Sequence, residues 1–248
     1  MIAEIKWMLR YKLVAWRRAV IGWPADISSW IKFWRGYKAY GYLSGPNRQP
    51  PLDRLYPCLG DDTEETYIEP IYFYQDAWAF ERILLQRPQD HVDVGSHHKF
   101  VALLSKAVPV TMVDIRPLSL PLESLRFRKG SILNLPFEDG SVHSLSSLCV
   151  VEHIGLGRYG DPLDLQGSEK AIAELKRVLA PEGSLYISLP IDDENRIYFN
   201  AHRSFKEDYI LGLLDSLEII QKRYIFGKNF VEKSRPGFGI GCYHLRKT

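Results

Sequence analysis

The segment "HVDVGSHHKF" (residues 91–100) has the pattern of a short strand, a glycine turn and the start of a helix. Asp93 lies at the end of the strand and Gly95 lies in the turn. In parallel α/β sheets a ligand binds at the carboxyl ends of the strands, where glycine lets backbone approach it and helix N–H groups receive its anionic part. Asp114, in "MVDIRP", ends the next predicted strand, where a carboxylate accepts hydrogen bonds from ribose hydroxyls. Together the two stretches predict a nucleoside site.

Strands and helices alternate on both sides of this segment. Strands are predicted over residues 91–95, 110–115, 142–151 and 184–189, and helices over 71–86, 101–107 and 169–179. We expect Ser168 to cap the last of these helices, and Pro181 with Gly183 to end it. Two further strands, 217–226 and 241–247, follow without a helix between them. The pattern predicts an α/β fold with a doubly wound, mostly parallel, Rossmann-like sheet and an N-terminal helical extension.

Residues 1–70 form a predicted extension with a proline-rich connector, and residues 71–248 form the α/β domain. Residues 1–40 contain eight Lys and Arg against Glu4 and Asp26, together with five of the six tryptophans. An apolar stripe follows Ile2, Ile5, Leu9, Leu13, Trp16 and Val20. Two interpretations stay open: the helix docks on the α/β domain, or it makes peripheral contact with an anionic membrane surface.

Composition narrows the class of protein. A chain of 248 residues with 46% hydrophobic residues can bury the core of one α/β domain. The three cysteines form no CxxC pair, so we expect neither a disulfide framework nor a zinc site. No apolar run approaches the roughly 18 residues of a membrane span, and the N-terminus lacks a signal-peptide pattern. These features predict a cytoplasmic protein without a nucleic-acid partner and leave a homo-oligomer open.

The turn after the first predicted strand also limits the ligand. The full GxGxxG pattern is absent, because His97 and His98 stand where small residues are expected. Since pyrophosphate requires that close backbone approach, a dinucleotide fits poorly. A nicotinamide-dependent sugar enzyme is therefore disfavoured, and a nucleoside without phosphates, such as S-adenosylmethionine, fits better.

Two longer stretches carry a family resemblance. "GSILNLPFEDGSVHSLSSLCVVEHIG" (residues 130–155) and "ELKRVLAPEGSLYISLP" (174–190) resemble class I S-adenosylmethionine-dependent methyltransferases, which commonly show "GDA..LPF.D.SFD....VLEHI" and then "RVLKPGG". More closely, "VVEHIGLGRYGDPLD" (150–164) with "FNAHRSF" (199–205) resembles an uncharacterised methyltransferase-like branch known only as a domain of unknown function. The resemblance implies a methyltransferase with S-adenosyl-L-methionine as its cofactor.

The resemblance also implies a set of cofactor residues. It implies a cofactor turn shaped by Asp93, Gly95 and Ser96, a ribose contact at Asp114 and Ile115, and an adenine edge at Ser131 and Ile132. The family usually has an aspartate where Ser131 stands, and His143 replaces the usual acid before the fourth strand. Together with His97, these departures keep open a degenerate methyltransferase fold that serves as a binding or scaffold protein.

The acceptor side is predicted after the strand at residues 142–151. Methyl transfer requires the acceptor to be held in line with water excluded, and an oxygen acceptor must lose a proton to a base. Candidate catalytic residues are His153 as base, Glu152 as its partner and His202 as a second base. Candidate acceptor-binding residues are Arg158, Tyr159, Asp161, Asp164 and Arg203. The alternatives are that Glu152 and His153 begin a helix and that the charges lie on a solvated loop.

The acceptor expected from these residues is a hydroxyl on a sugar or glycan intermediate, or on another small polar molecule. A metal site made by His153, Asp161, Asp164 and His202 is disfavoured, because their spacing matches no ligand motif. Cys149 is predicted to be a buried thiol, since no Pro-Cys pair accompanies it. The Asn/Asp-Pro-Pro-aromatic motif of amino-group methyltransferases is also missing, which argues against DNA adenine or protein glutamine as acceptor.

Overall fold

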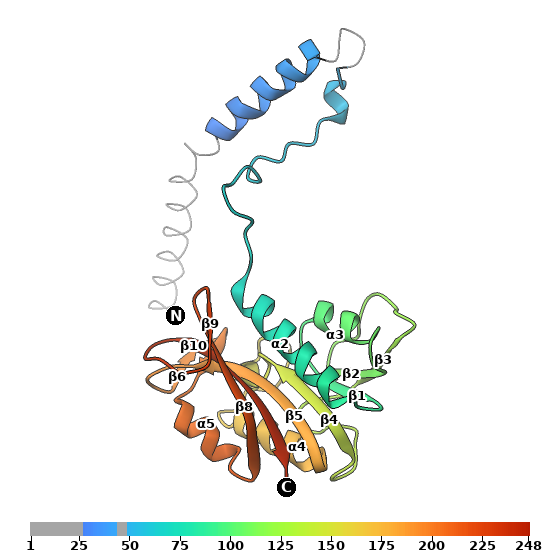
Figure 1. Cartoon of the computed structure of the whole chain (residues 1–248), viewed down its shortest axis with the longest axis vertical. Helices are drawn as coiled ribbons and strands as arrows, with labels where there is room; N and C mark the ends of the chain where they lie inside the picture. The colour runs from blue at the N-terminus through green and yellow to red at the C-terminus, as the bar shows by residue number, and fades with distance from the viewer. Residues whose placement is uncertain (1–26, 44–48) are drawn as a thin grey trace. The chain divides into compact units, whose positions relative to one another are not determined.

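The computed structural model describes residues 27–43 and 49–248, and the chain divides into two compact units, Met1–Tyr67 and Ile68–Thr248 (Figure 1). In the first unit residues 27–43 are helical and a short 3₁₀ helix, η1, covers Leu52–Arg54. The hydroxyl of Tyr37 donates to the carbonyl oxygen of Pro50 at 2.6 Å. The apolar stripe predicted between Ile2 and Val20 lies outside the described residues. Within the described part of the chain, no helix is long and apolar enough to cross a membrane.

The second unit is built on one eight-stranded sheet. Its strands are β1 (His91–Val94), β2 (Val110–Asp114), β3 (Leu125–Lys129), β4 (Val142–Leu148), β5 (Leu179–Ile191), β8 (Leu217–Phe226), β9 (Asn229–Val231) and β10 (Gly239–Lys247). They lie in the order β3-β2-β1-β4-β5-β10-β8-β9. The first five are parallel, and β10 pairs antiparallel with both β5 and β8. The predicted mostly parallel sheet with a closing strand pair is confirmed.

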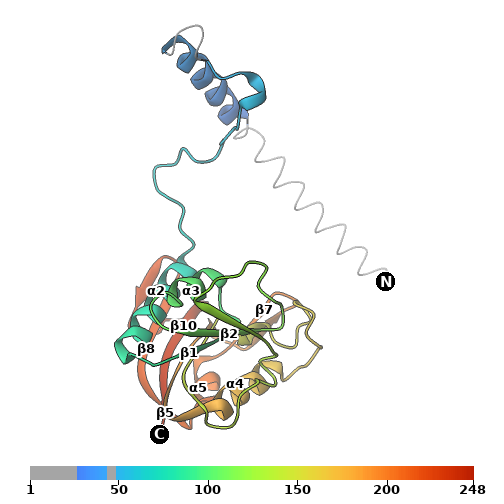
Figure 2. The same ribbon diagram turned by 90° about the vertical axis from the view of Figure 1, so that its right-hand side faces the viewer.

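Helices cover both faces of this sheet. They are α2 (Pro70–Gln86), α3 (His98–Leu104), α4 (Gly167–Val178) and α5 (Glu207–Leu213). Apolar side chains of α2 and α3 share one core cluster, and those of α4 and α5 share another on the opposite face (Figure 2). The parallel strands therefore all end on the same side of the sheet, where a ligand can reach the loops that follow several of them.

Helix boundaries follow local capping chemistry, with one wrong prediction. The side chain of Glu69 accepts from the backbone N–H of Tyr72 at 2.7 Å, and Pro70 suits the first helical position of α2. Ser168 does not cap α4, because the helix begins at Gly167 with Gln166 as its N-cap. Instead the buried hydroxyl of Ser168 donates to the carbonyl oxygen of Val151 at 2.7 Å. This bond ties α4 to the 3₁₀ helix η2 (Val151–His153), which follows β4.

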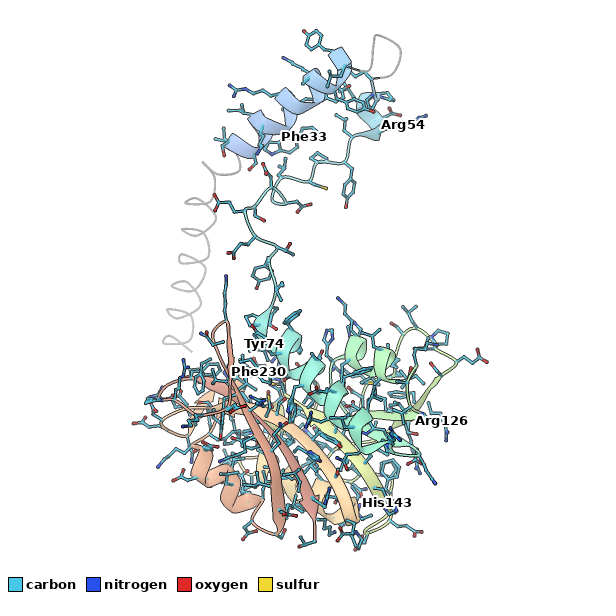
Figure 3. All side chains as sticks on the ribbon, in the orientation of Figure 1. Phe33, Arg54, Tyr74, Arg126, His143 and Phe230 are labelled. Carbon is cyan, nitrogen blue, oxygen red and sulfur yellow. The ribbon has the colours of Figure 1, made fainter. Side chains whose placement is uncertain are left out.

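The structure adds elements that the sequence pattern did not indicate. These are β3, α5, β9 and a separate hairpin of β6 (Arg196–Tyr198) with β7 (His202–Ser204). The β8–β9 turn packs on α2, where the ring of Tyr74 stacks on Phe230 with centroids 5.2 Å apart and its hydroxyl donates to the carbonyl oxygen of Lys228 (Figure 3). This contact fixes the start of α2, whose first turn reaches the cavity described below.

Candidate functional site

A cavity of about 820 Å³ lies at the carboxyl ends of β1, β2 and β4. Its walls come from the turn after β1, the loop after β2, the segment after β3, and the region from the end of β4 to Asp161. A volume of this size lies in the range of small-molecule sites. Predicted residues on its walls are Gly95, Ser96, Asp114, Ile115, Ser131, Ile132, His153, Tyr159 and Asp161. The structure therefore brings residues proposed for the cofactor and for the acceptor to one space.

The buried side chain of Asp93 holds the turn after β1 in place. Gly95 has a φ of 72°, and a Cβ there would lie 3.0 Å from Cγ1 of Val150. Asp93 is fully buried, and its Oδ1 accepts from the backbone N–H of Ser96 at 3.1 Å. Burial raises the pKa of Asp93 to about 6, so the carboxyl is mostly ionised at neutral pH. Asp93 thus holds the turn, and the backbone of Gly95 faces the ligand space.

A buried relay that sequence reasoning missed supports Asp93. Ser146 donates its hydroxyl to Oδ2 of Asp93 at 2.5 Å, so Ser146 accepts from Nε2 of His91 at 2.8 Å. Nδ1 of His91 must then accept from the hydroxyl of Ser144, 2.7 Å away. Burial lowers the pKa of His91 to about 3, which keeps the ring neutral, as this relay requires. Ser144 and Ser146 alternate along β4 in the sequence. Only the pairing of β4 with β1, which the sequence does not show, brings them next to His91 and Asp93.

The other predicted cofactor residues lie on the part of the cavity wall that follows β2 and β3. Oδ1 of Asp114 accepts from the backbone N–H of Arg116 at 2.8 Å, which orients the carboxylate at the end of β2. Oγ of Ser131 accepts from the N–H of Leu133 at 3.2 Å, and the buried side chain of Ile132 supplies an apolar surface. A carboxylate beside an apolar ledge and a glycine turn fits a nucleoside. His143, by contrast, is exposed near the amino end of β4, away from these walls (Figure 3).

His153 lies on the cavity wall with a defined tautomer. Its Nδ1 is 2.7 Å from the carbonyl oxygen of Ala201, which can only accept, so Nδ1 carries the proton. Nε2 therefore keeps its lone pair. Burial lowers the pKa of His153 to about 4, and the ring is neutral at pH 7. Nε2 is free to accept a proton, but a pKa of about 4 makes His153 a weaker base than the one that the sequence predicted.

Glu152 is buried behind the wall and is not one of its lining residues. Burial raises the pKa of Glu152 to about 8, so the carboxyl is protonated near neutrality. Its Oε1 lies 3.8 Å from Nε2 of His153, but neither group is charged there and the two do not form an ion pair. Oε2 is buried without a hydrogen-bond partner. Glu152 thus lies beside His153 without a hydrogen bond to it and does not line the ligand space.

The burial of Glu152 makes the free energy of unfolding of the protein depend on pH. Because its pKa is raised on folding, the folded state binds more protons, and stability falls as pH rises toward about 8. The lowered pKa values of His91, His153 and His244 have the opposite effect, which is largest below their unfolded pKa of about 6.5 and fades above it, where each still adds about 0.4 kcal/mol. We expect the free energy of unfolding to fall by about 2 kcal/mol between pH 6.5 and 8 through Glu152. Urea unfolding of the ligand-free protein measures this.

Glu152→Gln should remove most of that fall, because glutamine has the same shape and does not titrate. Asp76, whose pKa burial raises to about 7, should leave a smaller residual slope. Glu218→Gln, at an exposed position on β8, serves as the matched control. An unchanged slope in the Glu152 variant would contradict the buried, protonated carboxyl.

The loop after η2 is held by polar groups predicted to bind the acceptor. The carboxylate of Asp161 accepts from the backbone N–H groups of Gly155, Gly157 and Tyr159 at 2.6, 3.4 and 3.2 Å. Arg203 is buried, and its guanidinium donates to the carbonyl oxygens of Ile154 and Asp164. Arg203 therefore ties this loop to β7, which favours a structural role over the predicted acceptor contact.

The remaining predicted residues lie outside the cavity walls of the second unit. Asp164 binds Nζ of Lys170 at 2.6 Å, and Arg158 donates to the carbonyl oxygen of Ala201 at 2.9 Å. His202, on β7, packs against the rings of Tyr198 and Phe238 with centroids 4.9 and 5.9 Å away. Asp164, Arg158 and His202 therefore do not line the cavity.

Several wall residues were not predicted. The guanidinium of Arg116 lies 4.3 Å above the ring of Tyr159, which joins the loops after β2 and η2 across the cavity. Tyr72, in the first turn of α2, packs on His97 with centroids 4.8 Å apart. Residues 118–122 add apolar wall from a loop. The available signal was the three leucines at every second position of "RPLSLPL" (residues 116–122), which are unusual in a solvated loop.

Cys149 also lines the cavity, directly after β4. Its backbone is left-handed with a φ of 52°, and its thiol donates to the side-chain oxygen of Gln75 at 3.1 Å. Burial raises the pKa of this thiol well above its usual range. A protonated thiol is a poor nucleophile, so Cys149 contributes to the surface of the cavity and not to nucleophilic catalysis.

A family model described as "Caenorhabditis protein of unknown function, DUF268" matches residues 137–224, less than half of the chain. No curated protein matches. The structure is similar to a protein assigned as a sarcosine dimethylglycine methyltransferase from Galdieria sulphuraria, with 17% identity, a TM-score of 0.53 and coverage of 74% of this chain and 92% of that one.

Two further solved structures to which this chain is similar are also methyltransferases. One is the 1,6-didemethyltoxoflavin-N1-methyltransferase of Burkholderia thailandensis with bound S-adenosylhomocysteine (18% identity, TM-score 0.51, coverage 75% and 93%). The other is the N-methyltransferase NodS of Bradyrhizobium japonicum (15% identity, TM-score 0.51, coverage 75% and 98%). The chain has the Rossmann-like fold of these methyltransferases. At such low identity the likeness concerns the fold alone.

Proposed function

We propose that this protein is an S-adenosylmethionine-dependent methyltransferase that methylates a hydroxyl of a sugar or glycan intermediate, or of another small polar molecule. The observation that carries the proposal is the single cavity, which joins the wall at Gly95, Asp114 and Ile132 to His153. The fold shared with methyltransferases supports it. The family match over residues 137–224, which contains both "VVEHIGLGRYGDPLD" and "FNAHRSF", supports a place in an uncharacterised methyltransferase-like branch.

Each wall has a part in the proposed reaction. When bound, the cofactor supplies a methyl group on a sulfonium. Asp114 would accept hydrogen bonds from the ribose hydroxyls, Ile132 would pack on the adenine, and the turn at Gly95 would receive the amino-acid end. Nε2 of His153 would accept the proton that the acceptor hydroxyl loses. Tyr159, held under Arg116, would keep water from the reacting oxygen.

The surroundings of His153 support a polar ring as the acceptor. The segment that accepts from His153, at Ala201, is the turn of the β6–β7 hairpin. That hairpin carries Tyr198 and His202, whose rings continue onto Phe238. Aromatic rings with polar edges suit a sugar, because one face of a sugar ring is apolar and its rim carries hydroxyls. The proposed acceptor therefore extends from the cavity onto this hairpin.

Calorimetric titration with S-adenosylhomocysteine tests the cofactor half of the proposal. We expect one site with a Kd on the order of micromolar. NADH should not bind, because the turn after β1 lacks the glycines that pyrophosphate requires. If the folded protein binds neither ligand, the scaffold alternative replaces the enzyme.

A further inference from the structure

The helix over residues 27–43 exposes an apolar face. Ile27, Trp30, Ile31 and Trp34 recur at steps of three and four, so they lie on one side of the helix. Their exposed fractions are 50, 40, 48 and 40%. They line a shallow hollow whose edge is completed by Arg35 and Lys38. Large apolar residues at such exposure mark an interaction surface.

Aromatic rings of this helix are already packed against one another. Trp30 stacks on Trp34 with centroids 6.5 Å apart, and Phe33 and Tyr37 meet Trp34 edge to face at 5.3 and 5.8 Å. Binding would therefore cost little further side-chain entropy. The rings' contacts with one another also leave fewer free faces for stacking nucleobases, which disfavours RNA as the occupant.

The charge of the same helix is entirely basic. Residues 27–43 contain Lys32, Arg35 and Lys38 and no acidic residue. Lys32 is paired with Asp62 from the connector, whereas Arg35 and Lys38 border the apolar hollow. Basic residues beside tryptophans are the composition of helices that lie in the plane of a membrane interface, where each basic group is attracted to anionic headgroups.

We infer that the helix over residues 27–43 docks on the surface of an anionic lipid bilayer, with Trp30 and Trp34 in the headgroup region and Arg35 and Lys38 toward the phosphates. Residues 1–26 contribute five further Lys and Arg to the charge of this part of the chain. The apolar face and the basic charge supply the two contributions that set the binding strength of such a helix, buried apolar area and attraction to anionic lipids. The inference does not depend on the proposed enzymatic function.

Vesicle flotation of the full-length protein tests the inference. Vesicles of phosphatidylcholine with phosphatidylserine should carry the protein, and vesicles of phosphatidylcholine alone should carry much less. Binding should shift tryptophan emission to the blue, because five of the six tryptophans lie in residues 1–40 and the sixth, Trp78, is already buried. Arg35→Gln with Lys38→Gln should weaken the partition by about fivefold for each charge removed.

The decisive variant is Trp30→Ser with Trp34→Ser, which should lower the partition by about tenfold or more. Tyr56→Ser with Tyr67→Ser is its matched control, since it removes two exposed aromatic residues of the same unit and should bind as the unchanged protein does. Far-ultraviolet circular dichroism, which reports the backbone, checks that each variant stays folded. Equal binding by the tryptophan variant, equal binding to both kinds of vesicle, or binding to RNA in place of vesicles would overturn the inference.

Discussion

Asp114→Ala should weaken the binding of S-adenosylhomocysteine by about a hundredfold, because two hydrogen bonds from ribose hydroxyls to a carboxylate are lost together. Asp114 lines the cavity at the end of β2, and the N–H of Arg116 already holds its Oδ1 at 2.8 Å. The carboxylate is therefore preorganised, and its loss is not offset by freeing a mobile side chain. Calorimetric titration beside the unchanged protein gives the ratio.

Two variants separate this effect from general damage. Asp114→Asn keeps one oxygen, which can still accept from the N–H of Arg116, and replaces the other by an NH2 group that can only donate to a ribose hydroxyl, so about a tenfold loss is expected. Asp90→Ala removes an exposed carboxylate that precedes β1 at the opposite edge of the sheet, and binding should not change. If the unchanged protein binds tightly and Asp114→Ala binds equally well, the ribose assignment is wrong although the cofactor assignment stands.

The fold could be predicted from sequence wherever burial creates a periodic pattern. β1, β2 and β4 are largely buried, and β8 begins and ends at the predicted residues, 217 and 226. β3 was missed because Arg126, Arg128 and Lys129 occupy an exposed edge strand and leave only two apolar residues. The short β6–β7 hairpin carries too few residues for any period to appear.

The site was predictable at strand ends and less so in loops. Gly95 and Asp114 follow from the predicted strands, and Ile132 follows from the family resemblance; all three line the cavity. Arg203 could not be assigned from sequence, because its guanidinium binds backbone carbonyl oxygens that only the folded loop brings together. Likewise, the sequence could not show whether His143 contacts a ligand. The structure places its side chain away from the cavity walls.

Gly155→Ala should destabilise the protein by about 3 kcal/mol or more and should distort the acceptor side of the cavity. Gly155 has a φ of 82°, and a Cβ there would overlap the carbonyl oxygen of Asp164. The backbone of Asp164 cannot move freely, because it is held on both sides. Its N–H donates to the carbonyl oxygen of Gly155 at 3.0 Å, and its carbonyl oxygen accepts from the guanidinium of Arg203. The N–H of Gly155 also donates to Asp161 on the cavity wall, so the displacement reaches the site.

The same loop offers a control for backbone strain alone. Gly160 has a φ of 88°, but a Cβ there would meet no atom within 4 Å. Gly160→Ala should therefore cost only about 1 kcal/mol, the price of a left-handed alanine. Urea unfolding of both variants isolates the steric part as their difference. Equal destabilisation would mean that the loop adjusts freely around residue 155, and the rigid acceptor wall inferred from Arg203 and Asp161 would then be wrong.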